Sequence, residues 1–123
     1  MTPDRFSALA LAVGPGVHPR AILEAVQFRV GGQAFATLGW PAAGWAVVKI
    51  APARQAWALA LSDGLAPEPG RRRKAGIILA RLSGLDDGAA AELLAAAWSH
   101  AHGPARRGGR AGERSASAQV LSV

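Results

Sequence analysis

Cysteine is missing from all 123 residues of the sequence, which excludes disulfide bonds and thiolate metal sites. No apolar run approaches the roughly 20 residues that span a bilayer, so we expect no membrane contact. The apolar stretch near the N-terminus follows Asp4 and Arg5 and therefore lacks the net positive charge that precedes the apolar part of a secretory signal. We expect a cytoplasmic protein.

The residue patterns of common enzyme sites are missing as well. Ser62, Asp63, Ser99 and His100 supply hydroxyl, carboxylate and imidazole groups, but no serine lies in a nucleophile-elbow pattern. His100 and His102 are two residues apart, which directs them to different sides of a helix, so we expect no metal site. The glycine-containing segments do not match a phosphate loop between a strand and a helix. These gaps predict a protein that is not an enzyme and holds no cofactor.

What the sequence has instead is positive charge in two short segments. Of the net charge of +6, residues 103–123 carry +3, and the remaining residues outside one further cluster sum to −1. That further cluster consists of Arg71, Arg72, Arg73 and Lys74. Such a distribution favours a local anionic partner over a broadly basic surface. The alternative is an ordinary solvated charge run in a chain with an arginine-rich codon bias.

Periodic apolar residues predict helices at both ends of the folded part. Phe6, Leu9, Ala10 and Val13 form one stripe of a short helix after the possible caps Thr2 and Asp4. Residues 18–24 are expected to form a connector with room for one helical turn. A second helix is expected over residues 52–61, and the last runs from a cap at residue 86 or 87 to about residue 101. Trp57 and Trp98 are expected in the core.

Three antiparallel strands are expected over residues 26–50. A two-residue turn of Gly31 and Gly32 tolerates positive φ angles and predicts a hairpin. Its register would pair Phe28 with Phe35 and Val26 with Thr37 on one face. The residues expected on the opposite face, left partly open, are Gln27, Arg29, Ala34 and Ala36.

The second half adds a buried strand over residues 75–82 and a short edge strand over residues 65–67. The sequence thus predicts an α+β fold, an antiparallel sheet of four to five strands with three helices packed on one face, in the order α-β-β-β-α-(β)-β-α. Residues 1–102 would form one domain. Residues 103–123 have almost no apolar bulk and are expected to be a disordered basic tail.

Several segments, in this order, resemble the MmcQ/YjbR family. They are GPGV at 14–17, FRVGGQAFA at 28–36, VVK at 47–49 and ELLAAAW at 92–98. The resemblance covers roughly residues 4–102. It implies a compact α+β domain with a frataxin-like sheet, and it implies DNA binding through strands and loops. Two positions depart from the family pattern, Gln33 where a lysine is common and Ile77 where a tryptophan is common.

These observations lead to a non-enzymatic DNA-binding protein that contacts mainly backbone phosphates. The basic cluster would make the main contact, and Arg29 and Lys49 would lie on or beside the open sheet. The alternative is a protein-interaction module that uses the sheet face or the turn between Trp40 and Trp45. An exposed tryptophan beside basic strands could also stack on unpaired bases.

Overall fold

The computed structural model of the protein describes residues 1–69 and 75–103. Over this part of the chain it has three α-helices, six strands and two short 3₁₀ turns. The elements are α1 (Pro3–Ala12), β1 (His18–Ile22), β2 (Ala25–Val30), β3 (Gln33–Leu38), β4 (Trp45–Lys49), α2 (Gln55–Leu59), β5 (Leu65–Pro67), β6 (Ile77–Arg81) and α3 (Asp87–His102). The expected tail, apart from Gly103, lies outside the described residues.

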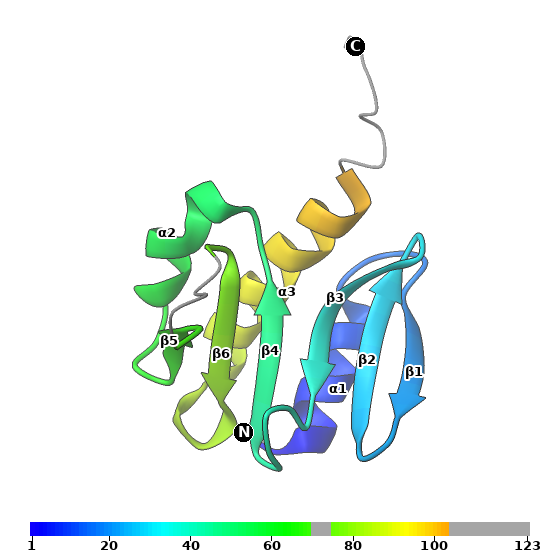
Figure 1. The fold of residues 1–123 in the computed structure, drawn as a ribbon, viewed down its shortest axis with the longest axis horizontal. Coiled ribbons are helices and arrows are strands. Elements are labelled where there is room, and N and C mark those ends of the chain that lie inside the picture. The colour runs from blue at the N-terminus through cyan, green and yellow to red at the C-terminus, as the bar shows by residue number, and fades with distance from the viewer. Residues whose placement is uncertain (70–74, 104–123) are drawn as a thin grey trace, which may run out of the picture.

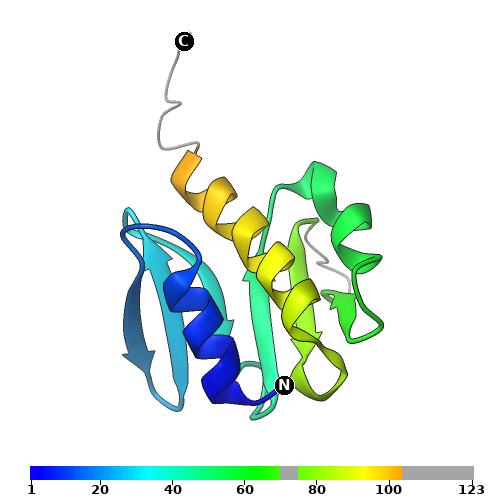
Figure 2. The same ribbon diagram turned by 180° about the vertical axis from the view of Figure 1, so that it is seen from behind.

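All six strands belong to one antiparallel sheet in the order β1-β2-β3-β4-β6-β5. Helices α1 and α3 cross one face of it, in front in Figure 2, while Figure 1 looks onto the other face. Helix α2 lies beside β5 and β6. The α+β fold class is therefore confirmed, with one strand more than expected.

The additional strand is β1, in the segment expected to be a connector. It pairs with β2 over five residues, from His18 opposite Arg29 to Ile22 opposite Ala25. All five of its residues are exposed, so the segment does not need the alternation of apolar and polar residues by which a half-buried strand is recognised. The turn that follows is made by Leu23, at a φ of 53°, rather than by a glycine. Without apolar alternation or a glycine turn, the usual hairpin signals were missing.

The hairpin of β2 and β3 turns where predicted, but its register was predicted wrongly. Gly31 and Gly32 have φ angles of 56° and 81° and connect Val30 to its partner Gln33. A bulge then shifts the pairing, so that Phe28 lies opposite Ala36 and Val26 opposite Leu38. The extra residue is Phe35. A bulge sets two residues against one on the partner strand, and here both Phe35 and Ala36 become buried.

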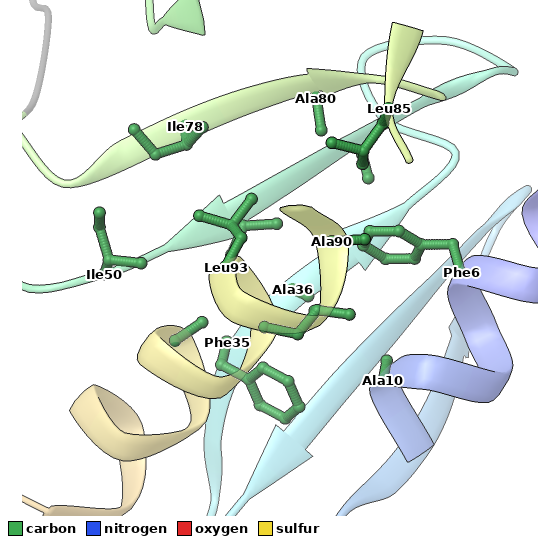
Figure 3. Close-up of a cluster of buried hydrophobic side chains, with 14 of the residues drawn as sticks. Phe6, Ala10, Phe35, Ala36, Ile50, Ile78, Ala80, Leu85, Ala90 and Leu93 are labelled. Atoms are coloured by element: carbon green, nitrogen blue, oxygen red, sulfur yellow. The ribbon is translucent and has the colours of Figure 1, made fainter. Parts of the chain in front are cut away.

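The core lies between the sheet and the helices (Figure 3). Phe6 of α1 and Phe28 of β2 are completely buried, with ring centroids 6.5 Å apart. Leu93 and Ala90 of α3 face the strands in the same cluster. Because Ala36 belongs to this cluster, its predicted place on the open face was wrong.

Side-chain caps begin the two longer helices. The Thr2 hydroxyl accepts a hydrogen bond from the Arg5 amide at 3.1 Å, and the Asp86 carboxylate accepts one from the Ala89 amide at 2.7 Å. Capping oxygens of this kind satisfy amides that have no partner within the helix. Trp57 and Trp98, expected in the core, are half-buried at its margin. No helix of the described residues is long and apolar enough to cross a membrane.

Candidate functional site

The uncovered face of the sheet carries the charged residues of the strands. One row across it is set by the register, with Arg20 opposite Gln27, Gln27 opposite Thr37, Thr37 opposite Val47, and Val47 opposite Leu79. Side chains alternate between faces along a strand. Residues two positions along the same strand from a member of this row, with no extra residue inserted in that strand, therefore share its face. These are Arg29 on β2, Lys49 on β4 and Arg81 on β6.

Charge on this face has one sign. Arg20, Arg29, Lys49 and Arg81 are the charged residues of the six described strands, none of which contains a carboxylate. The carboxylates in the described ranges lie in helices, turns and loops. Arg5 and Asp87 form an ion pair at 2.8 Å that joins α1 to α3. None of the four strand cations forms such a pair with a carboxylate of residues 1–69 and 75–103.

Arg29 is held by neutral acceptors. Its Nη1 donates to Oε1 of Gln27 and its Nη2 to the Gly32 carbonyl, both at 2.6 Å. These contacts fix the half-buried guanidinium on the open face without neutralising it. A positioned guanidinium is suited to bind a phosphate through its remaining N–H groups.

Lys49 is exposed at the end of β4. Strands β2 and β4 run in the same direction, so Lys49 and Arg29 lie toward the same end of the sheet (Figure 1). The next residue, Ile50, donates its amide to the carbonyl of Gly76 at 2.8 Å. Gly76 closely follows the predicted main contact in the sequence. That cluster, Arg71, Arg72, Arg73 and Lys74, lies outside the described residues.

Two cations of the open face were not predicted as site residues. Arg20 lies in β1, which was not expected to be a strand, and it is exposed. Arg81 ends β6, is exposed, and donates from Nη1 to the Ser83 hydroxyl at 3.0 Å. Alternation along the predicted buried strand places Arg81 on the face opposite to Ile78 and Ala80. The sequence therefore contained enough information to place Arg81 on the open face.

An apolar groove opens at the end of this face, between the β1–β2 turn and the β3–β4 loop. Its volume is about 660 Å³. Leu23 is fully exposed beside it, Trp40 is 60% exposed and Ile22 is 38% exposed. Gln27 and Thr37 of the open-face row also line it. Trp45, which was grouped with Trp40 in the sequence, is half-buried in β4 opposite Arg81.

Ser62, considered for catalysis, holds a turn, and Asp86 is the cap of α3 that was expected at residue 86 or 87. The Ser62 hydroxyl donates to the Gly84 carbonyl at 2.8 Å and accepts from the Gly64 amide at 3.1 Å. Within the described ranges, no three histidine, aspartate or glutamate side chains are grouped so that they could hold a metal ion.

Comparison of the chain with protein-family models, with curated proteins and with solved structures gave no significant match. The resemblance to the MmcQ/YjbR family stays a prediction from the segments quoted above.

Proposed function

We propose that the protein binds nucleic acid, DNA in the first instance, by contacting backbone phosphates with the open face of its sheet. The observation that carries the proposal is the distribution of charge over the strands. Every charged strand residue of the described chain is a cation, and all four face away from the helices. The resemblance to the MmcQ/YjbR family leads to the same class of ligand.

A polyanion is the ligand that this arrangement favours. Phosphate contacts position a protein on nucleic acid without demanding a specific base sequence. Arg29, Lys49, Arg20 and Arg81 are spread over the sheet rather than gathered in one pocket, which suits a ligand with repeated charges. The cluster at residues 71–74, which lies outside the described residues, would add four charges to the proposed interface.

Salt dependence gives the direct test. If about four to six phosphates are neutralised, the logarithm of the association constant should fall with the logarithm of salt concentration at a slope of roughly −4 to −5. The measurement is fluorescence anisotropy of labelled duplex DNA over a series of salt concentrations. A flat response would reject the proposal.

Variants compared per charge removed locate the interface. Replacing Arg20, Arg29, Lys49 and Arg81 together with glutamine should remove most of the binding, and each of the four single substitutions should weaken it. Arg54→Gln is the control for the single substitutions, because it removes one charge from an exposed residue on the helix side, with its guanidinium 3.9 Å from the Trp57 ring centroid. Equal losses in Arg54→Gln and in the four single variants would show that net charge, and not the open face, carries the affinity.

A second candidate function rests on the groove. Fully exposed Leu23 and largely exposed Trp40 lie together in the groove and support an interaction with another protein. That function predicts binding that depends little on salt. It also predicts a loss of partner binding in Trp40→Ala, while Trp45, half-buried in β4, does not line the groove.

A further inference from the structure

The groove beside Trp40 combines an aromatic wall with a polar floor. Trp40, Pro41, Ile22 and Leu23 supply apolar surface, and Gln27 and Thr37 come from the cross-strand row of the open face. Its volume of about 660 Å³ falls within the roughly 300–1,000 Å³ of small-molecule sites. A flat group with polar edges matches this lining better than a purely aliphatic one.

The groove is joined to the cations through Gln27. Its Oε1 accepts from Arg29, and its cross-strand partner on β1 is Arg20. Arg20 also lies two residues before Ile22, on the same face of β1. A chain that leaves the groove and continues over the open face would therefore pass Arg20 and Arg29.

We infer that the groove holds an unpaired nucleobase stacked on Trp40, and that the preferred ligand is single-stranded nucleic acid. This inference rests on the proposed function and specifies its ligand. In a duplex the bases are stacked inside and only their edges are accessible. In a single strand each base can leave the backbone and stack on an aromatic ring while cations contact the phosphates. Trp40 and the neighbouring arginines provide both contacts.

Charge complementarity selects this occupant over an apolar protein segment. Arginine borders the groove without lining it: Arg29 donates to the side chain of Gln27, a lining residue, and Arg20 is the cross-strand partner of Gln27. The single acid that lines it is Glu24, in the β1–β2 turn. A base enters the groove as a neutral group, so the phosphates can pass over Arg20 and Arg29, where Glu24 repels them only weakly.

The test compares a short oligothymidylate with an abasic oligomer of the same length, because the two carry the same phosphates. We expect the oligothymidylate to bind about 5- to 100-fold more tightly, the range for stacking of one base on an aromatic side chain. Failure of both oligomers to bind, with duplex DNA still bound, would overturn the inference alone, and failure of duplex DNA as well would reject the proposed function itself. Equal binding of both would leave phosphate binding in place and overturn the inference.

Substitutions of Trp40 separate stacking from apolar contact. Trp40→Phe should keep most of the preference for the base-bearing oligomer, while Trp40→Leu and Trp40→Ala should remove it. Leu11→Ala, at a 43% exposed apolar residue of α1, controls for the loss of exposed apolar surface. If Trp40→Leu behaves like Trp40→Phe, the groove takes an aliphatic occupant and the inference is wrong.

Glu24→Gln tests the sign of the ligand's charge. Removing this carboxylate should raise the affinity for the oligothymidylate about twofold, as expected for one exposed charge near a polyanion. A cationic protein partner would instead lose affinity. An unchanged or weaker affinity for the oligomer would place the phosphates elsewhere and contradict the path described above.

Discussion

The two faces of the sheet differ in charge although the same strands build both. On the helix side, Phe28, Val48 and Ile78 are buried and uncharged. On the other side, alternate residues of the same strands include Arg29 and Lys49. Strand alternation therefore separates the charged residues of the described strands from the core. Four cations on strands that contain no carboxylate are the basis for proposing an anionic ligand.

The largest expected effect is on the free energy of unfolding and concerns the helix side of the sheet. Phe28→Ala removes a completely buried ring that lies against Phe6, and it should lower the free energy of unfolding by about 3–5 kcal/mol. Arg20→Gln, at an exposed residue of β1, should change it by no more than about 0.5 kcal/mol. Urea denaturation followed by circular dichroism measures both. Similar losses in the two variants would contradict the division into a face that carries the core and a face that contributes little to stability.

The next effect concerns the contact between the end of α3 and the turn after α1. A Cβ on Gly14 would lie 2.5 Å from the nearest ring atom of Trp98, whose Nε1 donates to the Pro15 carbonyl at 3.2 Å. Gly14→Ala should therefore force the ring or the turn to shift and cost about 1–3 kcal/mol in the free energy of unfolding. The same denaturation experiment measures it.

Gly88→Ala is the matched control for that substitution. Its added Cβ would meet only the Asp86 carboxylate oxygen at 3.5 Å, an ordinary contact within the first turn of α3. We expect it to be neutral or stabilising, because alanine is the better helix former. Affinity for nucleic acid should be unchanged in both glycine variants, since neither residue lies on the open face.

The sequence predicted the fold class, the Gly31 and Gly32 turn and the place of the last strand, because these depend on local turn chemistry and apolar alternation. It did not predict β1, whose residues are all exposed and whose turn contains no glycine. The bulge at Phe35 was missed too, because burying both Phe35 and Ala36 is a demand of packing against α3 and not of local propensity.

The candidate site was predictable only where it depends on alternation along a predicted strand. Arg29 lies on the open face as expected, because the extra residue of the bulge, Phe35, belongs to β3 and the alternation along β2 is intact. Arg20 required β1, and the groove required the β1–β2 turn and the β3–β4 loop to lie side by side. That juxtaposition follows from the strand order, which no single segment encodes.

The smallest expected effect is on the salt dependence of binding and concerns Lys49. Lys49→Gln removes one exposed cation from the open face, and if Lys49 contacts a phosphate the salt slope should become less steep by about 0.9. Arg54→Gln removes the same charge from the helix side and should leave the slope unchanged, although it lowers the net charge equally. Anisotropy titrations of duplex DNA with both variants at matched salt concentrations measure the difference. Because a diffuse attraction responds to net charge and a phosphate contact responds to position, equal slopes in the two variants would remove Lys49 from the interface.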